Sequence, residues 1–309
     1  MLNGEMPELA AMEPAPVITT EEPDESRPDI WAAYAYFEGK PTKAAMALIQ
    51  SLIPSAAKAK PILERLPDAD WVTISQQGIE PVHAGRFYVH TSTNAGAIPA
   101  GSVPFLIEAS QAFGTGGHAT TEGCLWVLDG LKRRGKRFDH VVDIGTGTGL
   151  LAFAARALWP RAFVTASDID PVSVDVTADN AEANAVPLGG RPGELALCGA
   201  SGTDHALVQG RAPYDLVIAN ILAGPLIELA PSFAEIIGDG GTLILAGLLD
   251  HQSGAVASAY RRYGFRLSAK RENGDWPCLT LTKRARYSWK RPIRATGRTN
   301  QAPGDFGTW

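Results

Sequence analysis

An aspartate and three alternating glycines form the segment with the clearest capacity for ligand chemistry. They lie in VVDIGTGTG, residues 141–149, where Asp143 closes an apolar run and Gly145, Gly147 and Gly149 follow it. The next residues, LLAFAARALW, have apolar side chains at helical spacing. A strand, a tight turn and a helix in this order leave helical N–H groups unpaired and bring bare backbone beside the end of the strand. The spacing therefore predicts a nucleotide-binding turn.

A carboxylate near the end of the next apolar run, FVTASDID, is the second candidate ligand. Asp168 stands where a doubly wound sheet places the acid that bonds both hydroxyls of a ribose. The alternative is a strand-end carboxylate that faces solvent. Asp170 precedes Pro171 and is expected to cap the following helix instead. For Asp143 two roles remain open, namely a hydrogen bond within the turn and a contact with the ammonium group of a ligand.

The residue after the third glycine bears on which nucleotide the turn binds. A dinucleotide fingerprint requires a small residue where this chain has Leu150, which speaks against a nicotinamide cofactor. The tighter GxGxG pattern, preceded by an acid, resembles the S-adenosylmethionine-dependent methyltransferases. In that family the turn accommodates the methionine part of the cofactor. The resemblance implies transfer of a methyl group from a sulfonium, a good leaving group, so no metal is required.

The elements that must position these residues alternate between strand and helix from residue 141 onward. This rhythm predicts a parallel sheet with helices on both faces. The last two expected strands have no helix between them and are expected to pair antiparallel at the sheet edge. The predicted fold class is α/β and Rossmann-like, with a mostly parallel seven-stranded sheet that ends in an antiparallel strand. The strands are expected at 141–144, 163–167, 195–198, 216–220, 243–247, 265–268 and 278–282, and the helices at 149–159, 171–185, 225–237 and 252–263.

The rest of the chain divides by composition. Residues 1–28 are rich in proline and acids and are expected to be disordered. Residues 29–70 predict a small α/β module with a strand in Asp29–Gly39, a helix that opens at Pro41 and a short strand within Lys60–Trp71. The remaining parts are a linker with short strands at 71–112, the domain of the glycine turn at 113–284 and a disordered basic tail at 285–309.

Bulk composition narrows the function classes. The formal net charge is −5 over 309 residues, which argues against bulk non-specific binding of nucleic acid but leaves a local basic patch open. The three cysteines are odd in number and far apart, so neither a disulfide framework nor a zinc site is indicated. No apolar run approaches the roughly 18 residues of a membrane helix, and the first residues do not form a signal peptide. We therefore expect a cytoplasmic protein.

Three segments resemble one family within this class, the ribosomal protein L11 methyltransferases (PrmA). FGTGGHATT, residues 113–121, resembles the family signature FGTGTHPTT, and VIANILAGPLIELAP, residues 217–231, is similar to the segment after the family's fourth strand. Residues 168–186 fit as well, and the resemblance covers roughly residues 71–282. It implies a class I methyltransferase that uses S-adenosylmethionine to methylate lysine side chains and the N-terminal α-amine of ribosomal protein L11.

The resemblance also implies site residues. Asn220 is the candidate catalytic residue because its amide oxygen can orient an amine, and capping the next helix is its alternative role. The loop 113–117 is suited to be a lid or is a plain connection, and His118 is expected to be a hydrogen-bonding strut. Cofactor contacts fall on Thr121, Gly145, Asp168 and Asn220, with Gly147, Phe113 and Thr115 beside them.

The implied partner is ribosomal protein L11, free or during assembly, without a membrane and without sequence-specific contact to nucleic acid. The family recognises this protein through a βαββαβ module, of which the sequence shows clearly only the second half, and Gly117 and Ala119 replace the usual Thr and Pro of the signature. Three alternatives remain open. They are a methyltransferase for another protein or a small molecule, a nicotinamide-dependent oxidoreductase, and a non-catalytic binding module, against which Asp168 and Asn220 speak.

Overall fold

The structure is a computed structural model and describes residues 17–21, 32–37, 39–51, 53, 60–65, 80–108 and 119–285. The chain separates into two compact units between Ala69 and Asp70. This division lies beside the boundary at residue 70 that the sequence suggests. The two units are described separately below.

The first unit contains a two-stranded sheet and a helix. Strand β1 (Val17–Glu21) pairs antiparallel with β2 (Ala32–Tyr36), and helix α2 spans Lys43–Ser51. The hydroxyl of Thr42 accepts a hydrogen bond from the Ala45 N–H (3.1 Å) and caps the first turn of α2. The strand and helix predicted within residues 29–70 are therefore present.

One prediction for this part of the chain was wrong, and another is contradicted in the residues that the structure describes. Residues 1–28 were expected to be disordered, yet β1 lies among them because VITT is a run of four β-branched residues that favours extended backbone. The proline-rich and acidic surroundings obscured that run. The short strand expected within Lys60–Trp71 does not occur in residues 60–65, where Pro61 lacks a ladder donor, and residues 66–71 lie outside the described residues.

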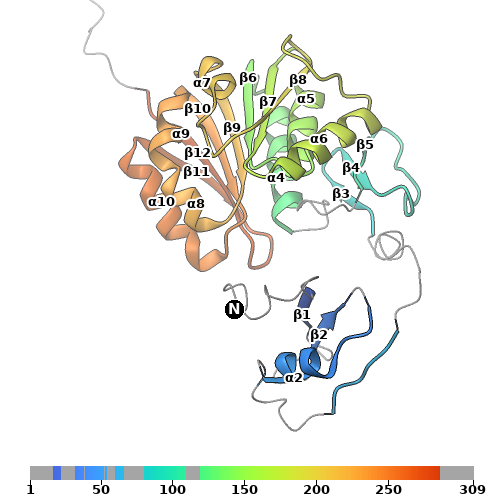
Figure 1. The fold of residues 1–309 in the computed structure, drawn as a ribbon. Coiled ribbons are helices and arrows are strands. Elements are labelled where there is room, and N and C mark those ends of the chain that lie inside the picture. The colour runs from blue at the N-terminus through green and yellow to red at the C-terminus, as the bar shows by residue number, and fades with distance from the viewer. Residues whose placement is uncertain are drawn as a thin grey trace, which may run out of the picture. The chain divides into compact units, whose positions relative to one another are not determined.

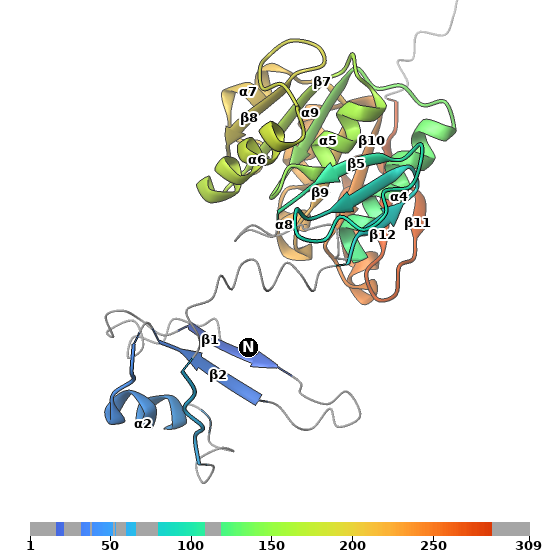
Figure 2. The same cartoon turned by 90° about the vertical axis from the view of Figure 1, so that its right-hand side faces the viewer.

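The second unit opens with a small three-stranded sheet. Strands β3 (Val82–Ala84) and β4 (Phe87–His90) form a hairpin, and β5 (Val103–Leu106) pairs parallel with β4. Its inner side chains pack against helix α4 (Ala119–Arg133), which lies beside it in Figure 2. The short strands expected within residues 71–112 are thus part of the packed unit.

A seven-stranded sheet forms the centre of the second unit, as Figure 1 shows. Strands β6 to β10 are mutually parallel, while β12 lies between β10 and β11 and is antiparallel to both. The last two strands therefore pair antiparallel as predicted, but the reversed strand is second from the edge. The order is β11-β12-β10-β9-β6-β7-β8. The bounds are β6 His140–Ile144, β7 Phe163–Asp168, β8 Leu195–Gly199, β9 Tyr214–Asn220, β10 Ile237–Ala246, β11 Phe265–Arg271 and β12 Cys278–Lys283.

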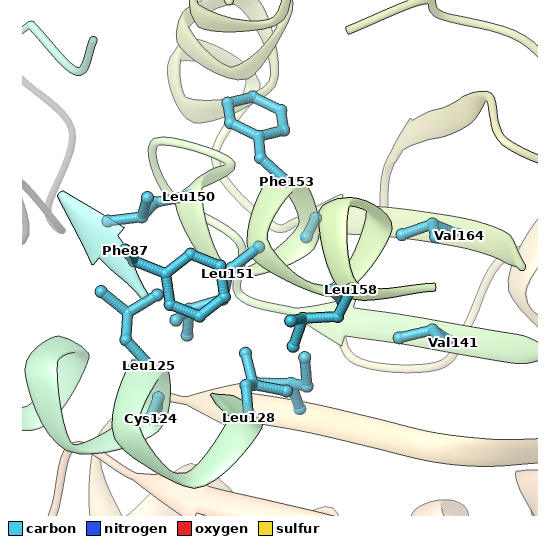
Figure 3. Packing of buried hydrophobic residues seen from close by; sticks show 14 of the residues in the cluster. Phe87, Cys124, Leu125, Leu128, Val141, Leu150, Leu151, Phe153, Leu158 and Val164 are labelled. Carbon is cyan, nitrogen blue, oxygen red and sulfur yellow. The ribbon is translucent and has the colours of Figure 1, made fainter. Parts of the chain in front are cut away.

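Helices cover both faces of this sheet because successive strand residues point to opposite sides. Val141 belongs to a core with α4 and α5, whereas Val142 belongs to a core with α9 and α10. Figure 3 shows the first core, where Leu125 and Leu128 of α4 meet side chains of α5. The remaining bounds are α5 Leu150–Leu158, α6 Pro171–Ala183, α7 Ala206–Gly210, α8 Ala223–Glu228, α9 Ala230–Ile236, η2 Asp250–Gln252 and α10 Ser253–Arg262.

The helix predicted at residues 225–237 is broken in two. Helix α8 ends at Glu228 and α9 begins at Ala230. Pro231 lies in the first turn of α9, where its missing N–H costs nothing, but in a continuous helix its ring would clash with the preceding turn. Among the described residues, none of the helices is both long and apolar enough to span a membrane.

Candidate functional site

The glycine turn joins β6 to α5 at the carboxyl edge of the sheet. Its three glycines have φ values of +73°, +58° and +85°, which side-chain-bearing residues adopt only under strain. The N–H groups of Gly145 and Thr146 donate to the carbonyl oxygen of Ser167 in β7 (2.8 and 3.0 Å). A Cβ atom on Gly145 would collide with Ile221, which follows β9. The turn is therefore held between two neighbouring strands, and Gly145 is its most exposed residue.

Asp168 is the last residue of β7 and braces this turn. Its Oδ2 accepts the N–H of Gly147 (2.8 Å), and its Oδ1 accepts the N–H of Asp170 (3.0 Å). Each carboxylate oxygen can accept two hydrogen bonds, so one position on each oxygen is left for the hydroxyls of a ribose. The side chain of Asp170 accepts the N–H of Val172 (3.0 Å) and caps α6, which confirms the capping role predicted for it.

Asp143 is fully buried beneath the same turn. The hydroxyl of Thr146 donates to its Oδ2 (2.8 Å), whereas its Oδ1 is buried without a hydrogen-bond partner. The pKa of this carboxyl is raised from 3.8 to about 7. Burial is the main cause and the nearby charge of Asp168 adds to it, while the Thr146 hydroxyl and the Ala152 N–H act in the opposite direction. Both roles left open by the sequence therefore keep support, because one oxygen bonds within the turn and the other lacks a donor.

Thr121 and Asn220 come together from positions 99 residues apart. Thr121 lies in the first turn of α4 and is 2% exposed, and Asn220 ends β9. The Nδ2 of Asn220 donates to the hydroxyl oxygen of Thr121 (3.1 Å). Because Nδ2 is engaged, the amide of Asn220 offers its Oδ1 as an acceptor. Ala219 lies opposite Ile144 in the sheet, so Asn220 ends its strand at the level where the glycine turn begins.

Two polar side chains of α6 support the turn and were not predicted. The hydroxyl of Thr177 donates to the carbonyl oxygen of Gly147 (2.9 Å), and the Nδ2 of Asn180 donates to the carbonyl oxygen of Thr148 (3.0 Å). Both side chains are buried. Their spacing of three residues places them on one face of a helix. That spacing, in a helix that follows the acidic strand end, is the signal that could have identified them.

The remaining predicted site residues lie outside the described part of the chain. These are Phe113, Thr115, the loop 113–117 and His118. The structure brings together Thr121, Gly145, Gly147, Asp168 and Asn220 at one edge of the sheet. Within the described residues, no group of three or more His, Cys, Asp or Glu side chains could hold a metal ion.

The strand order and the site together define a class of enzyme. A parallel sheet with one reversed strand, a glycine turn after β6, an acid at the end of β7 and an asparagine at the end of β9 make this chain a class I, S-adenosylmethionine-dependent methyltransferase. The model of one family, ribosomal protein L11 methyltransferase (PrmA), matches residues 8–284. The chain belongs to this family.

Individual relatives agree with the family. The chain is 41% identical to a ribosomal protein L11 methyltransferase of Brucella abortus (strain S19) over 219 residues, which are 71% of this chain and 74% of that protein. It is 43% identical to one of Caulobacter sp. (strain K31) over 224 residues, covering 72% and 75%. A crystal structure of ribosomal protein L11 methylase from Lactobacillus delbrueckii subsp. bulgaricus superposes with a TM-score of 0.54 at 25% identity, covering 67% of this chain and 98% of that chain.

These comparisons confirm the family inferred from the sequence. The family match begins at residue 8 and therefore includes the segment that was predicted to be disordered. The nicotinamide-dependent oxidoreductase and the non-catalytic module find no support.

Proposed function

We propose that this chain transfers methyl groups from S-adenosylmethionine to amines of ribosomal protein L11. Family membership supports the substrate, and the hydrogen bond between Asn220 and Thr121 beside the glycine turn is the structural observation that carries the proposal. The amines that we propose are lysine side chains and the N-terminal α-amine. Because the substrate is a ribosomal protein, free or during assembly, we propose that the enzyme acts in the cytoplasm.

The edge of the sheet fits the cofactor in three respects. The carboxylate of Asp168 has acceptor positions left for the two hydroxyls of a ribose. The buried Oδ1 of Asp143 lacks a donor, which an ammonium group would supply. Side chains on Gly145 or Gly149 would clash with Ile221 or Phe153, so only glycine permits the tight bend that brings backbone to the end of the strand. When bound, S-adenosylmethionine supplies a methyl group on a positively charged sulfur.

The amine must be neutral to attack, because a protonated amine has no lone pair. A lysine has a reference pKa near 10.4 and is almost wholly charged at neutral pH, whereas an α-amine near 7.7–8 is partly free. The Oδ1 of Asn220 accepts an N–H of the amine and leaves the lone pair free to point at the methyl group. Thr121 accepts one of the two Nδ2 hydrogens and fixes the orientation of the amide. We propose that Asn220 supplies orientation, which can account for several kcal/mol of the barrier.

A methyl-transfer assay on purified ribosomal proteins tests this proposal. We expect radiolabel from S-adenosylmethionine on L11, with intact-mass increments of whole methyl groups. Asp168→Asn should weaken cofactor binding at least tenfold, since it removes a carboxylate from the ribose. Asp170→Asn is the matched control, because asparagine is an equally good helix cap two residues away. Label on other proteins with none on L11 would contradict the proposed substrate, and equal effects of the two variants would contradict the ribose role.

A further inference from the structure

A run of cations follows α4 at the end of the helix farther from Thr121. LKRRGKRF places five basic residues within six positions, in a chain of net charge −5. The last turn of a helix favours cations, which accounts for Lys132 and Arg133. Arg134, Lys136 and Arg137 lie beyond the helix and are exposed. Within the described residues, no carboxylate forms an ion pair with any of these three. Their mutual repulsion disfavours folding, so a role in the fold does not explain them.

A hollow of about 500 Å³ lies beside α4, where the β3–β4 hairpin approaches the helix, and Arg133 of the basic run lines it. Gly85 permits this approach, because a Cβ there would lie 2.8 Å from Asp129 and its φ is +63°. The next residue, Arg86, donates from Nε to the buried carboxylate of Asp129 (2.6 Å). Arg133 approaches the other oxygen of Asp129 (3.8 Å) and is largely exposed. One carboxylate therefore orients two guanidinium groups at the wall of the hollow and leaves a surplus of positive charge.

A fixed indole ring forms another wall of this hollow. Trp126 is half-buried, and its Nε1 donates to Glu122 (3.3 Å). The guanidinium of Arg271 lies 4.9 Å from the centre of the ring. These contacts hold the indole in one orientation, with Arg271 over the ring, and leave for a base the part of the ring that lines the hollow. An aromatic face beside a groove of cations is the arrangement by which proteins bind single-stranded nucleic acid, with bases stacked on the ring and phosphates on the cations.

We propose that this face binds single-stranded RNA without sequence specificity. One base would enter the hollow and stack on Trp126. Arg134, Lys136 and Arg137 would contact the phosphates of the neighbouring nucleotides. The carboxylates of an acidic protein surface would use the cations but would not stack on the indole. The surface, called the basic surface below, consists of Arg86, Trp126, Arg133, Arg134, Lys136 and Arg137.

The basic surface leaves the catalytic edge accessible. Thr121 and Arg134 are separated by most of the length of α4, which at 1.5 Å per residue is about 20 Å. Phosphates bound at Arg134, Lys136 and Arg137 would therefore lie far from Asn220, whereas Trp126 is five residues, or about 7.5 Å along the helix, from Thr121. If L11 is the substrate, as proposed above, the enzyme could hold RNA and methylate a protein at the same time. The RNA contact itself does not depend on that substrate.

Fluorescence anisotropy with a labelled, unstructured RNA of about 12 nucleotides tests the proposal on the full-length chain. The triple variant Arg134→Gln, Lys136→Gln, Arg137→Gln should bind at least tenfold more weakly at about 50 mM salt. Its slope of log affinity against log salt should fall by about 2, at roughly 0.7 for each phosphate that the variant no longer neutralises. The matched control neutralises three other exposed cations, Arg261, Arg262 and Arg266, and should stay within about twofold of wild type.

A second variant tests the stacking part. Trp126→Leu removes the aromatic face and should weaken binding about fivefold or more, with the salt slope unchanged. The triple variant should methylate free L11 as wild type does and should melt no lower, because it relieves repulsion. Equal losses in the triple variant and its control, or no RNA binding at all, would overturn the proposal. Competition by polyglutamate as strong as by RNA of equal charge would assign the surface to an acidic protein instead.

Discussion

Asp143 gives the sharpest test of the site, because its burial makes the stability of the ligand-free protein depend on pH. Its pKa is about 7 in the folded protein and 3.8 in the reference state. Above pH 7 the folded protein holds a buried, partly unpaired charge. Below that pH the folded state takes up a proton that the unfolded chain does not, so stability rises as the pH falls from about 7 to about 4. At 1.36 kcal/mol for each pKa unit, the full effect is about 4 kcal/mol.

Denaturant unfolding of the ligand-free protein at about pH 5 and about pH 8 measures most of this effect. Wild type should lose about 2–3 kcal/mol between the two values through Asp143. Asp143→Asn carries no charge at either pH and should lose that much less. Asp139→Asn changes an exposed acid and should retain the dependence of wild type. If wild type and Asp143→Asn lose the same stability, the carboxyl does not titrate near neutrality and the reasoning from its burial fails.

The titration of Asp143 should also make the affinity for a cofactor analogue depend on pH. S-adenosylhomocysteine keeps the ammonium group that we assign to the Oδ1 of Asp143. Its affinity for wild type should rise as the pH passes upward through about 7, because the charged carboxylate pairs with the ammonium. Calorimetry on Asp143→Asn should show an affinity that is lower and independent of pH in this range. A matching pH dependence in the variant would place the ammonium elsewhere.

The contacts described above predict the effects of three further substitutions on catalysis or stability. Thr121→Val removes the acceptor for Asn220 and should lower kcat about tenfold, whereas Thr121→Ser should restore it, and steady-state kinetics on L11 distinguishes the two. Gly149→Ala puts a Cβ 2.6 Å from Phe153 at a φ of +85° and should destabilise the fold by about 2 kcal/mol or more in denaturant unfolding. Leu125→Ala leaves a cavity where α4 packs in the core and should cost about 2–5 kcal/mol in the same assay, and a cost below about 1 kcal/mol would contradict that packing.

The parallel strands could be predicted from the sequence because each is a short apolar run between helical patterns. The glycine turn and Asp168 could be predicted for a similar reason, since the turn needs glycine and the acid follows the next strand directly. The break before Pro231 could not be predicted in this way. A proline in the first turn of a new helix and a proline in the interior of a continuous helix give the same local sequence pattern. The strand β1 was missed because composition was averaged over a segment much longer than the strand.

The pairing of Asn220 with Thr121 could not be derived from periodicity. The two residues lie on different elements, and nothing local to either one encodes the other. The resemblance to a family supplied both residues, but not the hydrogen bond between them. Thr177 and Asn180 were missed for a related reason, since a polar residue in a helix is assigned to the solvent face unless its burial is known.

Different parts of helix α4 have three different roles. Its inward stripe packs in the core, its first turn holds Thr121 against Asn220, and its outer face carries Trp126 and Arg133. Sites more than about 10 Å apart without shared partners act independently to within about 0.5 kcal/mol. We therefore expect the triple variant of the basic surface and Asn220→Ala to combine additively in RNA binding and in methyl transfer. A combined variant whose RNA affinity differed from that of the triple variant would show that α4 transmits a change between its ends.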